Sequence, residues 1–182
     1  MKFTFAILAS ALAAAVAALP AEPAASNAEA YAPCPDVTKA ARLFRLYHSS
    51  SNNHFYTTSE VEANNAEKKL GYTREGSASF ILPTASPHTT PLYRLWSVGA
   101  SDHFYTTSND EANSATKLGY TREGIAGHVY KSTNCGGREL FRFWNGAVSD
   151  HFYTTDKKEG LNAGYAFEGN MGFVLPFNPV QW

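Results

Sequence analysis

The chain has 182 residues, with 15 lysines and arginines against 16 aspartates and glutamates and a formal net charge of −1. This balance provides no extended positive field, which argues against electrostatic binding to nucleic acid or to an anionic membrane surface. Aromatic residues make up 14% of the chain, which predicts an aromatic core, aromatic stacking surfaces, or both.

The N-terminus has the pattern of an export signal. Lys2 provides a positive start, and residues 3–19 form an alanine-rich apolar run that is short for a membrane span. We predict a signal peptide at 1–19 and an Ala/Pro-rich lead at 20–41 with no core of its own. The mature protein is then expected to be secreted and extracellular, with no membrane anchor.

Cys34 and Cys135 are the two cysteines of the chain. An oxidising compartment favours one disulfide between them. The bond would close a loop of about 100 residues, for which chain entropy gives roughly 4–5 kcal/mol. Two free thiols, or pairing of one thiol with another chain, are the alternatives. Neither cysteine has the spacing of a metal ligand.

From residue 42 onward the sequence repeats. The motif "HFYTT" begins at His54, His103 and His151, so the intervals are 49 and 48 residues. Eleven residues before each histidine a second motif begins, "LFRLY", "LYRLW" or "LFRFW", and "LGYTREG", "LGYTREG" or "NAGYAFEG" follows. Such periodicity is the signature of a repeat architecture. We predict a three-repeat domain over 42–177, with segments 42–84, 91–132 and 139–177 and a tail at 178–182.

Each segment predicts the same four elements. The first two motifs are rich in aromatic and β-branched residues and are separated by six residues, which predicts an antiparallel hairpin. "SEVE", "SNDE" and "DKKE" follow, and Ser/Asp-x-x-Glu is the capping box that begins a helix. In the first segment Ala63, Ala66 and Leu70 have the spacing of one buried helix face. Residues 72–82 predict a third strand.

One ββαβ unit cannot bury both faces of its own hairpin. Three units can do so by closing around a pseudo-threefold axis, which also removes exposed sheet edges. The predicted fold is therefore α+β, mainly β, with three ββαβ repeats closed in a propeller- or trefoil-like arrangement. Glu62, Glu111 and Glu159 belong to the capping boxes, so we assign them a structural rather than a catalytic role.

Strand alternation sorts the repeated side chains by face. On one face of each hairpin, an arginine and an aromatic residue lie near a histidine and a tyrosine. A flat ring beside hydroxyl, imidazole and guanidinium groups suits a sugar, whose C–H face stacks on the ring while its hydroxyls bind the polar groups. The candidate ligand-binding residues are Tyr47, His54, Tyr56, Trp96, His103, Tyr105, Trp144, His151 and Tyr153.

A structural explanation competes with ligand binding. Each arginine has a glutamate in its own segment. If the two are buried as an ion pair, they would recur in every segment because each buried charge needs the other, with no ligand involved. Asp102 and Asp150 would then cap the hairpin loops, and the histidines would donate to backbone carbonyls. Three related histidines could also meet at a zinc ion, but no further ligand motif accompanies them, so we predict neither metal nor cofactor. The predicted ion pairs are Arg45–Glu75, Arg94–Glu123 and Arg142–Glu168.

The three motifs resemble a family of secreted microbial proteins catalogued as a repeat domain of unknown function. Its members share Leu-Tyr-Arg-Leu-Tyr, Asp-His-Phe-Tyr-Thr-Thr and Leu-Gly-Tyr/Trp-x-x-Glu-Gly, and the similarity covers residues 42–177. The family's repeats occur alone or beside extracellular hydrolase domains, which implies a carbohydrate- or cell-wall-binding accessory. The chain departs from the pattern at Asn53, which replaces aspartate, and at Ala166 and Phe167, which replace Thr-Arg.

Every candidate group occurs three times, whereas a catalytic site needs one set of residues in distinct roles. The sequence has no nucleophile elbow, HExxH motif or P-loop, and we assign no catalytic residue. Multiplied sites suit multivalent binding. The predicted function is a secreted, non-catalytic, lectin-like module whose partner is an extracellular glycan or cell-wall polysaccharide. A structural or protein-interaction scaffold is the first alternative, and an extracellular glycan hydrolase is the second.

Overall fold

The computed structural model describes residues 32–175. The predicted signal peptide, most of the predicted lead and the tail at 178–182 lie outside the described residues. Within 32–175, no helix has the length and apolar character needed to cross a bilayer. The predicted mainly β fold is confirmed, with three short α-helices in this part of the chain.

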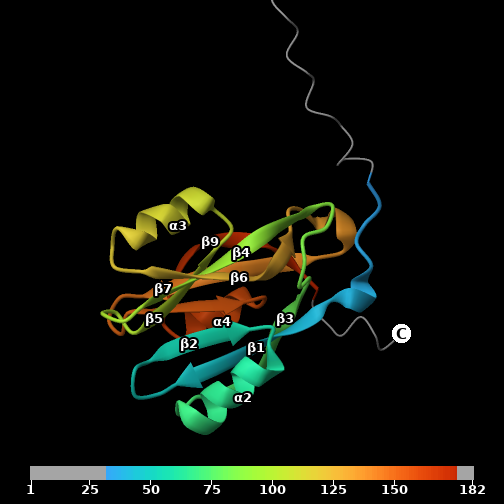
Figure 1. The fold of residues 1–182 in the computed structure, drawn as a ribbon. Helices are drawn as coiled ribbons and strands as arrows, with labels where there is room; N and C mark the ends of the chain where they lie inside the picture. Colours follow the sequence, from blue (N-terminus) through green and yellow to red (C-terminus); the bar gives the residue numbers. More distant parts are fainter. Residues whose placement is uncertain (1–31, 176–182) are drawn as a thin grey trace, which may run out of the picture.

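Each segment contributes a hairpin, a helix and a third strand (Figure 1). A short 3-10 helix precedes the first segment and another precedes the third. The elements are η1 (Val37–Lys39), β1 (Ala41–His48), β2 (Asn53–Thr57), α2 (Glu60–Lys69), β3 (Thr73–Ile81), β4 (Thr89–Ser97), β5 (Asp102–Thr106), α3 (Asn109–Thr116), β6 (Thr121–Tyr130), η2 (Thr133–Cys135), β7 (Arg138–Asn145), β8 (Asp150–Thr154), α4 (Lys157–Asn162) and β9 (Ala166–Val174).

In each segment the first strand lies between the other two and pairs antiparallel with both. The β6 and β9 strands also pair, through Tyr130 and Phe173, so the second and third segments share a six-stranded sheet in the order β5-β4-β6-β9-β7-β8. The first segment forms a three-stranded sheet, β2-β1-β3. A bridge between Phe80 and Leu175 ties this sheet to the end of the third segment.

The two faces of each hairpin pack against different partners, as strand alternation predicts. In the first segment Phe44 and Leu46 belong to a cluster with Ala63 and Ala66 of α2, and Figure 1 shows α2 against this hairpin, on the opposite side of the molecule from α3. The other face enters a central core that all three segments share. Its hairpin residues are Leu43, Tyr56, Leu92, Tyr105, Leu140 and Tyr153.

The predicted buried face of α2 is right for Ala63 and Ala66 and wrong for Leu70. Leu70 is the C-cap residue and is 62% exposed. The helix ends there because Gly71 takes a positive φ of 78°, a conformation that favours glycine and reverses the chain after a helix. Leu70 therefore stands outside the helix face that packs on the hairpin.

Three tyrosine hydroxyls link the second strands at the centre of the molecule. The Tyr56 hydroxyl donates to the Tyr153 carbonyl and accepts from the Tyr153 N–H, both at 2.9 Å. In the same way the Tyr153 hydroxyl binds the backbone of Tyr105, and the Tyr105 hydroxyl binds the backbone of Tyr56, at 2.7–2.9 Å. All three residues are 1% exposed. The cycle therefore satisfies buried backbone groups on the edge of each hairpin that has no strand partner.

The third segment shows how one core residue sets the size of another. Phe143 stands in its second motif where the other segments have leucine, and Gly160 stands in its helix where they have alanine. A Cβ atom at Gly160 would lie 2.6–2.7 Å from ring carbons of Phe143, far inside van der Waals contact. The larger ring therefore occupies the space of the missing methyl group, and glycine at this position follows from packing.

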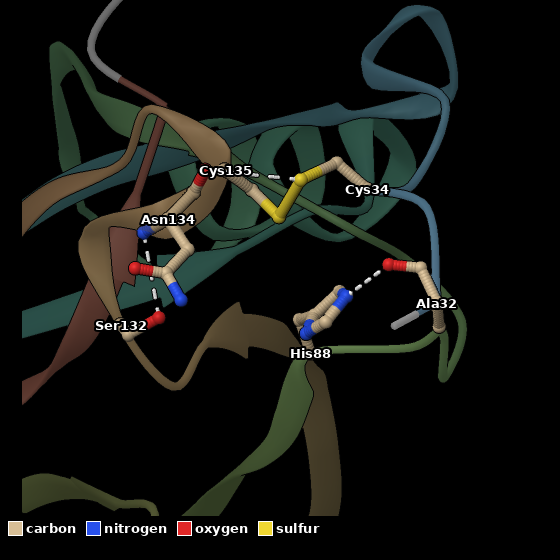
Figure 2. Close-up of a disulfide and its surroundings, with 6 residues drawn as sticks. All are labelled: Ala32, Cys34, His88, Ser132, Asn134 and Cys135. Atoms are coloured by element: carbon tan, nitrogen blue, oxygen red, sulfur yellow. Dashed lines mark hydrogen bonds between the residues drawn. A yellow bond between two sulfur atoms is a disulfide. The ribbon is translucent and has the colours of Figure 1, made fainter. Parts of the chain in front are cut away.

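The predicted disulfide between Cys34 and Cys135 is confirmed (Figure 2). It joins the lead to η2, just before the third segment, across a sequence separation of 101 residues. A second contact holds the same part of the chain, because His88 Nε2 donates to the carbonyl of Ala32 at 2.6 Å. The lead is thus attached to the two connections that precede the second and the third segments.

We predict that Tyr105→Phe lowers the free energy of unfolding by about 2–4 kcal/mol, because the N–H and carbonyl of Tyr56 lose their buried partner. Urea unfolding followed by tryptophan fluorescence measures this change. Tyr93→Phe is the matched control, since its hydroxyl makes no hydrogen bond within residues 32–175. Equal losses in the two variants would contradict the role of the cycle.

We predict that Gly160→Ala lowers the unfolding free energy by about 1–3 kcal/mol through overpacking against Phe143. Phe143→Leu in the same chain should recover most of that loss, because the smaller side chain returns the space for the methyl group. A double-mutant cycle in urea measures the coupling between the two sites. Additive effects would show that the two positions do not constrain each other.

Candidate functional site

The surface is hollowed where the helix of one segment meets the hairpin of another. We name these hollows the first, second and third junction pockets; they join segments one and two, two and three, and three and one, with volumes of about 180, 270 and 340 Å³. Each is lined by a phenylalanine, a capping-box glutamate and a tyrosine from one segment and a histidine from the next. These sets are Phe55, Glu62, Tyr72 and His103; Phe104, Glu111, Tyr120 and His151; and Phe152, Glu159, Tyr165 and His54.

Two of the histidines are held by a buried aspartate of a neighbouring segment. His54 Nδ1 lies 2.5 Å from Asp150 Oδ2, and His151 Nδ1 lies 2.6 Å from Asp102 Oδ2. Each aspartate also accepts the backbone N–H of its histidine and the hydroxyl of the tyrosine in the same pocket. Both aspartates are fully buried. The two aspartates therefore hold the histidines in place. The prediction that Asp102 and Asp150 cap the hairpin loops is wrong, and so is the prediction that the histidines donate to backbone carbonyls.

Asn53 takes the place of the aspartate at the first junction. Its Oδ1 accepts from the N–H of His103 at 2.9 Å, so its Nδ2 faces His103 Nδ1 at 2.9 Å and the Tyr72 hydroxyl at 2.6 Å. An amide nitrogen only donates, and His103 Nδ1 must therefore accept. Burial, with the positive charge of Arg94 adding to it, lowers the pKa of His103 to about 3.

Each arginine joins two segments through two glutamates. The predicted partner in its own segment lies 2.8–3.0 Å from the arginine Nε, although the Arg45 Nε–H is not aligned for a hydrogen bond with Glu75. The second partner is the capping-box glutamate of a neighbouring segment, at 2.8–2.9 Å, and it was not predicted. Each guanidinium also lies 4.9–5.3 Å from a phenylalanine ring of that segment. The second pairs are Arg45–Glu159, Arg94–Glu62 and Arg142–Glu111.

The predicted capping boxes are only half formed. The Ser59 side chain accepts the N–H of Glu62 as expected, but the Glu62 carboxylate binds Arg94 instead of the N-cap. The Thr57 hydroxyl accepts the Ser59 N–H in its place and donates to Glu62. Burial opposes ionisation of Glu62, but the hydrogen bonds from Arg94 and Thr57 outweigh it and lower its pKa. The glutamate thus serves the junction between segments, and its role remains structural.

Three of the candidate ligand-binding residues do not reach the pockets. Tyr56, Tyr105 and Tyr153 lie in the central core, their hydroxyls bind backbone groups, and none of them lines a junction pocket. Burial raises the pKa of each phenol well above its ordinary value. We therefore remove these tyrosines from the candidate binding set.

The remaining aromatic candidates contact the pocket histidines with tilted rings. The ring centroids of Trp144 and His151 are 4.4 Å apart, and Trp144 lines the second pocket. Tyr47 lines the third pocket, 4.6 Å from His54. The ring centroids of Trp96 and His103 are 4.5 Å apart, but Trp96 is not among the residues that line the first pocket. The structure thus places Trp144 and Tyr47 better for ligand contact than Trp96.

Sequence reasoning missed the aliphatic residues at the pocket rims. Leu70 lines the first pocket and Leu118 lines the second, with exposed fractions of 62% and 79%. Ala163 has the equivalent position in the third pocket. The spacing of Leu70 after Ala63 and Ala66 favoured a buried helix face, and nothing in the repeated Leu-Gly-Tyr motif indicated that its leucine lines a pocket.

The histidines occupy separate junctions. Within residues 32–175 no group of three or more histidine, cysteine, aspartate or glutamate side chains has the geometry to hold a metal ion. Each histidine instead places its Nδ1 against its own aspartate or asparagine. The tris-imidazole arrangement considered from the sequence is not formed in this part of the chain.

The chain belongs to a family whose function is unknown. The model of the domain of unknown function DUF5648 matches residues 42–175, well over half of the chain. No curated protein and no solved structure shows a significant match. The function must therefore be inferred from the junction pockets themselves.

We predict that His103 makes the fold sensitive to mild acid. Its pKa is about 3 when folded against an ordinary value of 6.5, so below pH 6.5 the unfolded chain binds a proton that the folded chain does not. The unfolding free energy should then fall by about 1.4 kcal/mol per pH unit from this residue alone. His103→Asn, which keeps an acceptor near Nδ1, should show a shallower fall between pH 6.5 and 5 in urea titrations. Parallel curves would contradict this assignment.

Proposed function

We propose that this DUF5648 protein is a secreted, non-catalytic carbohydrate-binding module that uses its junction pockets. The observation that carries the proposal is that three junctions form a small open pocket from the same residue types, namely phenylalanine, tyrosine, glutamate and histidine. The pockets lie near or below the lower end of the roughly 300–1,000 Å³ range of drug-sized sites. That size suits one sugar ring better than an extended cofactor.

The chemistry of the pocket walls supports a sugar. Aromatic rings and the rim leucines offer apolar surface for the C–H face of a sugar ring, and the histidine offers a polar atom for its hydroxyls. In the second pocket Trp144 stands beside His151, and Leu118 is at the rim. The partner we propose is an extracellular glycan or a cell-wall polysaccharide. The disulfide agrees with an oxidising compartment and hence with secretion.

We further propose that the three segments are repeats closed about a pseudo-threefold axis. The contacts between segments support this, because they run in one cyclic direction. The tyrosine hydroxyls, the pocket histidines and the arginines of segment one bind segment three, those of segment three bind segment two, and those of segment two bind segment one. A linear array of repeats would lack the contacts from segment one to segment three.

The hydrolase alternative finds less support in the pockets. General acid–base catalysis needs a carboxyl group that can reach the substrate and exchange a proton. The capping-box glutamates are held by an arginine and a threonine, and Asp102 and Asp150 are fully buried behind the histidines. The same pairing of the carboxylates with protein groups agrees with the scaffold alternative, because such pairs would also recur if their only role were to hold the segments together.

We predict that the double substitution Tyr47→Ala, Trp144→Ala reduces glycan binding at least about tenfold, because the aromatic ring that lines the pocket is lost at two junctions. Retention on insoluble polysaccharides and a glycan array, each with and without EDTA, measures this. Phe167→Ala is the control, since Phe167 is 42% exposed and lies outside the junction pockets. Undiminished binding by the folded double variant would refute the proposal. A wild-type protein that binds no glycan would favour the scaffold.

A further inference from the structure

The three junction pockets differ in the side chain that faces the histidine Nδ1, which is an aspartate in the second and third pockets and an asparagine in the first. A neutral imidazole carries a hydrogen on one nitrogen and a lone pair on the other. In the second and third pockets, Nδ1 of His151 and of His54 faces an aspartate carboxylate, which only accepts. The hydrogen of the neutral ring is therefore on Nδ1, and the lone pair is on Nε2.

The first pocket has the reverse arrangement. The backbone N–H of His103 fixes the oxygen of the Asn53 amide, so the amide nitrogen donates to His103 Nδ1. Nδ1 then holds the lone pair and Nε2 holds the hydrogen. A flipped amide would place two donors against each other at the backbone contact. With an asparagine instead of an aspartate against Nδ1, the Nε2 of His103 is therefore a donor, whereas the Nε2 of a neutral His54 or His151 is an acceptor.

In all three pockets this Nε2 atom lies 3.6 Å from a glutamate oxygen, which belongs to Glu75, Glu123 or Glu168. At the first junction, an Nε2–H faces a carboxylate, so donor and acceptor already match. At the other two, the Nε2 of a ring with its one hydrogen on Nδ1 is an acceptor that faces a carboxylate oxygen, and in that tautomer the two acceptors need a donor between them. The histidines are 7–8% exposed and line the pockets, so the pocket is the side from which that donor can come.

We propose that the second and third junction pockets each bind a sugar hydroxyl that donates to the Nε2 of His151 or His54, and that Asn53 deprives the first pocket of this acceptor. The proposal rests on the carbohydrate-binding function inferred above and makes the protein bivalent rather than trivalent. A sugar hydroxyl fits because it donates to the imidazole and also accepts from a neighbouring group. The ligand class is thus a neutral, hydroxyl-rich sugar rather than an anion.

The hydrogen positions can be tested without any ligand. Long-range proton–nitrogen NMR spectra of the folded full chain, labelled with ¹⁵N at histidine and recorded at pH 7.5, distinguish the two tautomers and the doubly protonated ring. We expect His103 to carry its hydrogen on Nε2, and His54 and His151 to carry theirs on Nδ1. The same tautomer in all three rings, or hydrogens on both nitrogens of His54 and His151, would overturn the proposal.

The number of sites is tested by titrating the same sample with methyl glucoside and, separately, methyl galactoside. We expect at least one of them to shift Nε2 of His54 and His151 and to leave His103 unchanged. Asn53→Asp should convert His103 to the other tautomer and add a third responding histidine. Asp102→Asn should remove the response of His151 and leave one. Asp110→Asn, the same change at an exposed position of α3, is the control and should keep two responding histidines.

The outcomes separate this inference from the function on which it rests. Equal sugar responses at all three histidines would overturn the two-site valency and leave carbohydrate binding intact. The expected tautomers without a sugar response at any histidine would overturn both the valency and the binding function. If Asn53→Asp does not fold, the other two proteins still test the number of sites. We expect two responding histidines in the unsubstituted protein and one in Asp102→Asn.

Discussion

The second strand of each hairpin has one edge paired with the first strand and one edge facing the centre of the molecule. Water does not reach that edge, so its backbone N–H and carbonyl groups need partners from the protein. The hydroxyls of Tyr56, Tyr105 and Tyr153 provide them, and each tyrosine serves a strand of another segment. No segment can satisfy its own inner edge in this way. The three segments therefore depend on one another, and the packing around them follows from that dependence.

The junction pockets are a consequence of this dependence. When one segment docks on the next, the outer part of its hairpin, with His103 and Arg94 in the second segment, meets the helix and tyrosine of its neighbour. The contact surface closes tightly at the centre, around the tyrosines, and leaves a hollow at the rim. Glu62 and Phe55 then both stabilise the junction and line the hollow. A substitution in a pocket is thus expected to affect the stability of the junction as well as ligand binding.

Most polar groups at the junctions already have partners, which limits what a ligand can use. The arginines hold two glutamates each, and the aspartates hold a histidine and a tyrosine. The groups left over are the Nε2 atoms of His54 and His151, the half-buried rings of Trp144 and Tyr47 that line the pockets, and the aliphatic rims. These are apolar surfaces beside one or two hydrogen-bonding atoms, the combination that suits a sugar ring. A strong anion or a metal ion would find the charged groups already occupied.

The sequence alone determined the hairpin, helix and third strand of each segment, their order, and some of the contacts within a segment. Tyr47 opposite His54, and Arg45 beside Glu75, follow from strand alternation and short separation in the chain. The tertiary structure alone decided that Arg45 binds Glu159, that His54 binds Asp150 and that Leu70 stands at a pocket rim. Local sequence cannot decide such contacts, because the repeated motifs place the same residue types in the same context in every segment. Which segment docks against which, and therefore which carboxylate meets which histidine, is fixed only when the segments pack together.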